Sequence, residues 1–148
     1  MSVDIVTGGA GFIGSHLVER LLGEGRRVRV LDNLSNGNLA NLAAHDGNRA
    51  LEVLNVDLAD AAAVEGTIPP GARVFHLAAL ADIVPSIEKP DAYFRSNVMG
   101  TFNVLQQARQ NQAQRFVYAA SSTCYGIPDS FPTPETAEIR PQCPYALT

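Results

Sequence analysis

The sequence of 148 residues has no tryptophan, only two cysteines and a formal net charge of −4. This negative balance excludes the diffuse positive field that attracts nucleic acid or an acidic membrane surface, so an anionic ligand has to be held by local contacts. No apolar run approaches the roughly 18 residues that a membrane span needs. The N-terminus also lacks the basic and long apolar segments of a secretory signal. We therefore expect a cytoplasmic protein with no nucleic-acid or membrane partner.

Cysteine occurs only as Cys124 and Cys143, both late in the chain. Neither forms a Cys-x-x-Cys pair or a cluster with the histidines, which are His16, His45 and His76. The sequence therefore indicates no metal site, and we expect both cysteines to be reduced thiols.

Glycine, in contrast, is concentrated where it is informative. Residues 3–14 read VDIVTGGAGFIG, a short β-branched run that ends in a glycine-rich turn and leads into an apolar helical pattern. The first N–H groups of a helix have no partner inside it and attract a phosphate group. Gly8 permits the tight turn, Gly11 lets the backbone approach a pyrophosphate, and Gly14 lets the helix pack closely. The segment predicts a dinucleotide site.

Asp32 strengthens this interpretation. It ends the next apolar run and lies 18 residues after Gly14, close to the spacing of roughly 20 residues for an acid that binds the adenosine ribose hydroxyls. Its charge repels a 2′-phosphate, and no arginine follows in the loop 33–38, so we expect NAD rather than NADP. An ordinary turn, in which the glycines serve only the backbone, is the alternative, but the agreement of strand, helix and acid disfavours it.

The rest of the chain alternates between strand and helix patterns. Further strands are expected at residues 27–31, 51–56, 73–77 and 115–120, and helices at 12–24, 39–44, 60–65 and 90–110. This alternation predicts an α/β fold, a Rossmann-type doubly wound parallel sheet with helices on both faces. The proline-rich segment 126–144 is expected to be a surface loop across the mouth of the site, followed by the first turn of a helix at 144–148.

Ligands of such a sheet gather at the carboxyl ends of the strands. Asp57 and Leu58 follow the third expected strand, and Ala78 and Ala79 follow the fourth. Asp57 is expected to bind an adenine amino group or to cap the next helix. The two alanines either let a cofactor pass close to the backbone or serve tight helix–sheet packing.

Four other polar residues each have a common structural role that competes with a role in chemistry. Ser121 follows the fifth strand, where serine is commonly a cap, and Tyr145 taken alone is a packing residue. His76 lies inside an apolar strand and is expected to be a hydrogen-bonded core histidine. Arg95 is expected on a solvated helix face, although it could reach a phosphate.

At this point the sequence resembles the extended short-chain dehydrogenase/reductases that act on nucleotide sugars, and most closely the UDP-sugar 4-epimerases. The matching segments follow the family's order across nearly the whole chain. They are TGGAGFIGSHL (7–17), LDNLSNG (31–37), VDLAD (56–60), VFHLAAL (74–80), SNVMGTFNVL (96–105), YAASSTCYG (118–126) and PYALT (144–148).

The resemblance implies a role for each matching position. The amides of Phe12 and Ile13 meet the pyrophosphate, Asp32 binds the adenosine ribose, and residues 57–58 bind the adenine. Residues 77–79 and Asn97 lie along the nicotinamide half. The expected cofactor-binding positions are Gly8, Gly11, Phe12, Ile13, Gly14, Asp32, Asn33, Asp57, Leu58, Leu77, Ala78, Ala79, Asn97 and Tyr145. Ser121 and Tyr145 are the implied catalytic residues.

The chemistry implied is a transient oxidation at C4 of the sugar. Tyr145 takes the 4-hydroxyl proton while hydride moves to NAD; the keto sugar then rotates and hydride returns to its other face. A phenol with a pKa of about 10 is ionised in only about one molecule in a thousand at pH 7, so nearby positive charge must lower its pKa. In the family this charge comes from oxidised nicotinamide and from a lysine four residues after the tyrosine, here position 149.

Because the sequence stops at Thr148, the resemblance implies an incomplete copy of a longer enzyme. Residues 1–148 are then its NAD-binding domain, without the C-terminal substrate domain, and the sheet is incomplete on that side. We expect this part to retain NAD affinity without turnover. The family often dimerises through a helix bundle that includes residues 90–110, so a homodimer is expected of the full-length protein.

Within the family, the residues after Ser121 favour an epimerase. A 4,6-dehydratase usually has Asp-Glu there, and a UDP-glucuronate decarboxylase usually has a glutamate at the second position, whereas this chain has Ser122 and Thr123. The expected substrate is a UDP-hexose or UDP-N-acetylhexosamine. The dehydratase and decarboxylase remain alternatives. A non-catalytic NAD(H)-sensing domain is an alternative of another class, but it does not need the Ser121 and Tyr145 pair.

Overall fold

Five strands pair side by side, all parallel, in the order β3-β2-β1-β4-β5 in the computed structural model, which describes residues 2–148. Their bounds are β1 Val3–Thr7, β2 Arg27–Asp32, β3 Leu51–Asn55, β4 Arg73–His76 and β5 Arg115–Tyr118. The chain builds outward from β1 to β3, then returns to the other side of β1 with β4. The carboxyl ends of β1 and β4 thus form the switch point where such sheets bind ligands. The predicted Rossmann-type sheet is confirmed.

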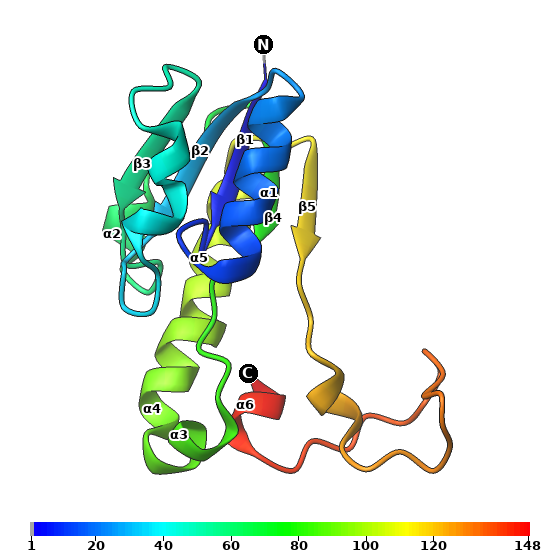
Figure 1. Ribbon diagram of the computed structural model, residues 1–148. Coiled ribbons are helices and arrows are strands. Elements are labelled where there is room, and N and C mark those ends of the chain that lie inside the picture. The colour runs from blue at the N-terminus through cyan, green and yellow to red at the C-terminus, as the bar shows by residue number, and fades with distance from the viewer. Residues whose placement is uncertain (1) are drawn as a thin grey trace.

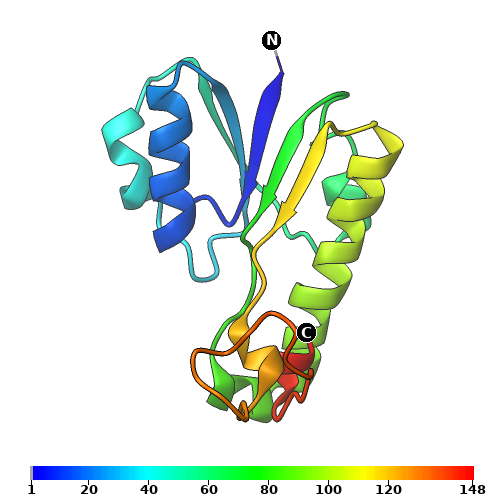
Figure 2. The same ribbon diagram turned by 90° about the vertical axis from the view of Figure 1, so that its right-hand side faces the viewer.

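Helices cover both faces of the sheet. Figure 2 shows α1 (Phe12–Gly23) on one face and α5 (Gly100–Gln110) on the other. The shorter helices are η1 (Leu39–His45), α2 (Ala61–Val64), α3 (Ile83–Glu88), α4 (Pro90–Tyr93), η2 (Phe94–Met99), η3 (Ser122–Tyr125) and α6 (Pro144–Leu147). None of the helices in the described part of the chain is long and apolar enough to cross a membrane.

Two hydrophobic clusters hold these layers together. Because successive strand residues point to opposite faces, Ile5 belongs to the cluster with Val104 of α5, whereas its neighbour Val6 belongs to the cluster with Val18 of α1. All four side chains are fully buried. The alternation fixes which face of the sheet each helix covers.

The helix predicted at 90–110 is continuous but not α-helical throughout. It consists of α4, a π-helical segment η2 and α5, which follow one another without a break. Helix α3 was not predicted, because a six-residue helix is too short to show a period. Its Pro85 lies in the first turn, where the missing N–H has no partner in any case. The other predicted elements are confirmed, with ends that differ by one or two residues.

The segment 126–143 has no regular helix or strand and leads into α6. Figure 1 shows this segment, coloured orange to red, beyond the carboxyl ends of the strands, with α6 next to α3. The absence of regular structure in this segment and the first turn of a helix after it are as predicted; that the segment crosses the mouth of the site stays a prediction. Cys124 and Cys143 are both free thiols.

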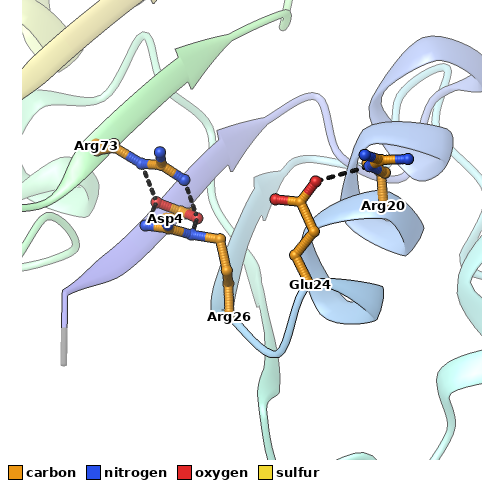
Figure 3. A network of polar contacts seen from close by, with 5 residues as sticks. All are labelled: Asp4, Arg20, Glu24, Arg26 and Arg73. Carbon is orange, nitrogen blue, oxygen red and sulfur yellow. Dashed lines mark hydrogen bonds and ion pairs between the residues drawn. The ribbon is translucent and has the colours of Figure 1, made fainter.

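A buried ion cluster fixes the opposite end of the sheet. Asp4 of β1 is fully buried and lies between Arg26 and Arg73 (Figure 3). Arg73 binds it in a bidentate manner, with Nε–Oδ1 and Nη2–Oδ2 distances of 2.8 Å. Burial alone would raise the pKa of Asp4, but the two guanidinium groups outweigh burial and hold the pKa below its ordinary value. The cluster joins β1 to β4 and to the start of β2.

Candidate cofactor-binding and active site

The turn after β1 brings the N-terminus of α1 against the switch point. Gly8 has a φ of +67°, and a Cβ there would lie 2.8 Å from the Ala78 backbone nitrogen. A Cβ at Gly14 would lie 2.1 Å from the Gly8 carbonyl oxygen, so the helix packs directly on the turn. Within α1 the first hydrogen bond comes from the Ser15 amide to the Gly11 oxygen. The amides of residues 12–14 therefore have no partner inside the helix.

Asp32 ends β2 beside this turn and is 7% exposed. Its Oδ2 accepts a hydrogen bond from the Ala10 amide at 3.0 Å, and its Oδ1 accepts one from the Leu34 amide at 2.9 Å. A carboxylate oxygen has two lone pairs, so each oxygen can accept one more bond. Gly37 leaves this side open, since a Cβ there would lie 2.8 Å from Oδ1. The carboxylate is fixed and ready to accept two hydroxyl groups.

Asp57 follows β3 and does not cap the next helix. Its Oδ1 accepts from the Ala59 amide at 3.0 Å, and its Oδ2 accepts from Arg95 Nη2 at 3.1 Å. The cap of α2 is Asp60, whose Oδ1 accepts from the Ala62 and Ala63 amides. The capping alternative for Asp57 was therefore wrong, because the chain makes a tight turn at Asp57 before the helix begins.

The loops after β1, β2, β3 and β4 enclose one cleft. Its lining residues are Gly8, Gly11, Phe12, Leu31, Asp32, Asn33, Ser35, Asn36, Gly37, Val56, Asp57, Leu58, Ala59, Leu77, Ala78, Ala79, Leu80 and Ser96. Most of the predicted cofactor positions lie on its wall. The lining residues that were not predicted are Leu31, Ser35, Asn36, Gly37, Val56, Ala59, Leu80 and Ser96. All but Ser96 lie near predicted positions at the same strand ends and loops, whereas Ser96 belongs to a helix and gave no sequence signal.

Four predicted cofactor positions do not border this cleft. Gly14 is buried in α1. The side chain of Ile13 is 68% exposed, so this residue can contribute to the site only through its backbone amide at the N-terminus of α1. Asn97 is buried, and Tyr145 lies on α6, beyond the carboxyl edge of the sheet. That these residues contact a cofactor stays a prediction.

A chain of hydrogen bonds fixes the loop that begins at Leu77. Thr7 Oγ1 accepts from the Leu77 and Ala78 amides, each at 3.1 Å. The Thr7 hydroxyl therefore donates its proton to His76 Nδ1, 2.8 Å away. The other ring nitrogen, Nε2, then carries the imidazole proton and donates it to Thr101 Oγ1 at 2.8 Å. Burial lowers the pKa of His76 to about 4, which keeps the imidazole neutral. The predicted core histidine is confirmed.

Asn97 holds the far end of the same loop. Its Oδ1 accepts from the Leu80 amide at 2.8 Å, and its Nδ2 donates to the Leu80 oxygen at 3.0 Å. Nδ2 also lies 3.0 Å from Thr148 Oγ1. One buried amide therefore connects the cleft wall to the residue directly after α6, the helix that carries Tyr145.

Ser121 and Tyr145 belong to neighbouring elements, because α6 packs against η3. Ser121 caps η3 through Oγ, which accepts from the Thr123 amide at 3.3 Å and lies 2.9 Å from Thr123 Oγ1. The capping role considered for this serine is thus present. Tyr145 packs edge-on against Tyr93, with ring centroids 6.3 Å apart. The Tyr93 hydroxyl accepts from the Asp82 amide at 3.2 Å, so the ring that Tyr145 contacts is anchored.

The class follows from a parallel sheet with this strand order, a glycine turn against its switch point and a buried acid at the end of β2: this is a Rossmann-type protein with its cleft at the carboxyl ends of the strands. Comparison with known proteins gives the family. The family described as GDP-mannose 4,6 dehydratase matches residues 5–148. The chain belongs to this family, within the short-chain dehydrogenase/reductases.

Individual relatives agree. UDP-glucose 4-epimerase 2 of Arabidopsis thaliana is 38% identical over 152 residues, which cover 97% of this chain and 43% of the relative. The structure of UDP-glucose 4-epimerase from Thermus thermophilus in complex with NAD is 39% identical, with a TM-score of 0.87, over 98% of this chain and 46% of that one. A dTDP-glucose 4,6-dehydratase from Streptomyces venezuelae, solved with NAD bound, is 35% identical, with a TM-score of 0.90, over 98% and 47%. The chain thus spans about half the length of these relatives.

Proposed function

We propose that this chain is the NAD-binding part of a nucleotide-sugar 4-epimerase. The observation that carries the proposal is the Asp32 carboxylate, which is buried at the cleft wall with each oxygen held by one backbone amide. The resemblance to epimerases and to enzymes solved with NAD supports the same cofactor. NAD supplies an acceptor and donor of hydride when it is bound.

The residues present fit this cofactor along the whole cleft. The free amides of Phe12 and Ile13 bind the pyrophosphate at the positive end of α1. Asp32 accepts from the two ribose hydroxyls, and its charge disfavours a 2′-phosphate. Asp57 accepts from the adenine amino group, and the loop 77–80 contacts the nicotinamide half.

Tyr145 and Ser121 are the proposed catalytic residues. Tyr145 takes the proton of the sugar 4-hydroxyl, and Ser121 hydrogen-bonds the same oxygen and keeps it in place. Positive charge near the ring would favour this proton transfer. Ser122 and Thr123 carry no carboxylate, so these positions offer no acid and base for eliminating water. This favours the epimerase over the dehydratase.

We further propose a UDP-hexose or UDP-N-acetylhexosamine as the substrate, and a homodimer as the assembled state of the full-length protein. Exposed apolar side chains recur along η2 and α5 and make up what we call the apolar stripe: Phe94, Met99, Phe102 and Leu105. These residues are spaced by five in the π segment and by three in the α-helix, which places them on one face. Such a stripe suits a helix-to-helix interface.

Isothermal titration of the chain with NAD and NADP tests the proposal. We expect NAD to bind and NADP to bind at least about tenfold more weakly, because a 2′-phosphate meets the Asp32 charge. The variant Asp32→Asn should lower the affinity for NAD by about tenfold or more and reduce the preference over NADP. Asp46→Asn, at an exposed acid after η1, is the matched control and should change neither affinity. Equal binding of the two cofactors by the unsubstituted chain would contradict the proposal.

A further inference from the structure

Arg95 holds the Asp57 carboxylate at the adenosine end of the cleft. Its Nη2 lies 3.1 Å from Asp57 Oδ2, while the Ala59 amide donates to Oδ1 from the other side at 3.0 Å. The carboxylate is therefore fixed by two donors, and each of its oxygens can still accept one bond. Both side chains are partly exposed, 66% for Arg95 and 45% for Asp57, so the pair adds little to stability. Its effect is on orientation.

The π-helical register of η2 is what directs Arg95 toward this loop. The Gly100 amide donates to the Arg95 oxygen, so one turn is closed by five residues, and Arg95 lies over Gly100. In a uniform α-helix, five residues span about 1.4 turns, and the two would point in different directions.

Gly100 and Asn103 contact the same loop. A Cβ at Gly100 would lie 3.3 Å from Leu58 Cβ, and Asn103 Nδ2 donates to the Leu58 oxygen at 2.9 Å. One helix face therefore presents Arg95, Gly100 and Asn103 to residues 57–59.

We propose that Arg95 is a positioning residue for purine recognition: it fixes Asp57 so that the carboxylate accepts a hydrogen bond from the exocyclic amino group of adenine. The inference rests on the proposed binding of NAD in this cleft. A 6-oxopurine has a carbonyl oxygen in place of that amino group, and it can donate nothing to Asp57 there. Arg95 therefore contributes to selectivity for adenine without contacting the base.

The test compares NAD with nicotinamide hypoxanthine dinucleotide by isothermal titration of the full chain. Arg95→Ala should weaken NAD binding by about two- to fivefold, the range of one exposed charge pair, and leave the affinity for the hypoxanthine analogue nearly unchanged. The preference for adenine then falls by the same factor. Arg95→Lys retains a cation that can reach Asp57 and should keep most of the preference.

Two further variants separate this role from a general effect of charge or folding. Arg109 is another exposed arginine of the same helical segment and contacts Gln106 at 3.2 Å, so Arg109→Ala should change neither affinity. In the background of Asp57→Asn, which removes the charge that Arg95 pairs with, Arg95→Ala should have no further effect.

An unchanged ratio of the two affinities in Arg95→Ala, or an equal loss for both ligands, overturns the role of Arg95 while leaving the proposed function intact. The same loss in Arg109→Ala also overturns it. Failure of the unsubstituted chain to bind NAD overturns the proposed function itself, and this inference with it.

Discussion

The backbone amide of Ala10 donates a hydrogen bond of 3.0 Å to Asp32 Oδ2. This bond joins the glycine turn after β1 to the acid that ends β2, so the proposed diphosphate site and ribose site have one fixed spacing. Asn38 and Asn41 add to the connection, because the Asn38 amide and Asn41 Nδ2 both donate to the Ala10 oxygen. The site is thus organised by hydrogen bonds to the main chain of Ala10.

Adding a methyl group at Gly14 should break the packing of α1 on the turn. Because a Cβ would lie 2.1 Å from the Gly8 oxygen, we expect Gly14→Ala to lower the free energy of unfolding by about 2 kcal/mol or more. Urea denaturation measures this. Gly23→Ala in the same helix meets nothing within 4 Å and should instead be neutral or stabilising, by up to about 1 kcal/mol. Equal effects of the two substitutions would contradict the close packing.

Stability should fall in mildly acidic solution because of His76. Burial lowers its pKa from 6.5 to about 4, so between these values the unfolded chain binds a proton that the folded protein does not. As far as His76 is concerned, the free energy of unfolding is highest above pH 6.5. It decreases as the pH falls from 6.5 toward 4, by about 1.4 kcal/mol per pH unit. Urea denaturation across this range should show the slope, and His76→Gln should flatten it. The exposed His16→Gln should retain it; a slope that survives in His76→Gln would refute the assignment.

The ion cluster at the other end of the sheet should matter for stability. Arg73→Met removes one of the two bidentate partners of the fully buried Asp4 while Arg26 remains, so we expect a loss of about 2 to 3 kcal/mol in the free energy of unfolding. The surface pair of Arg20 and Glu24, also drawn in Figure 3, is the control. Arg20→Met should leave thermal and urea denaturation almost unchanged. A similar loss in both variants would show that burial is not the cause.

If the homodimer forms through the apolar stripe on η2 and α5, a charged side chain placed in this stripe should prevent dimerisation. We expect light scattering after size exclusion to give the mass of two chains for the unsubstituted full-length protein and of one chain for Phe102→Glu, because a carboxylate in an apolar interface is costly. Ile127→Glu, at an exposed apolar residue outside the stripe, should remain dimeric. A monomer before any substitution would argue against an interface on this face.

The sequence predicted those features that depend on local pattern. The order of strands and helices, the glycine turn, and Asp32 at the end of β2 follow from periodicity and from the phosphate-binding property of a helix terminus. The fully buried runs Ile5-Val6 and Val30-Leu31 explain why the strands were recognisable. Each of these features involves residues close together in the chain.

Features that depend on tertiary contacts were not predictable. The π segment, and with it the pairing of Arg95 with Asp57, requires packing of the helix on a loop 38 residues away. The hydrogen bonds of the Asn97 amide to Leu80 and Thr148 likewise join residues far apart in the sequence.

The most direct test of the account is a crystal structure of the chain with NAD bound. We predict the diphosphate within hydrogen-bond distance of the Phe12 and Ile13 amides, and both ribose hydroxyls on the Asp32 carboxylate. A dinucleotide bound elsewhere, or this cleft left empty in crystals soaked with NAD, would contradict the central claim.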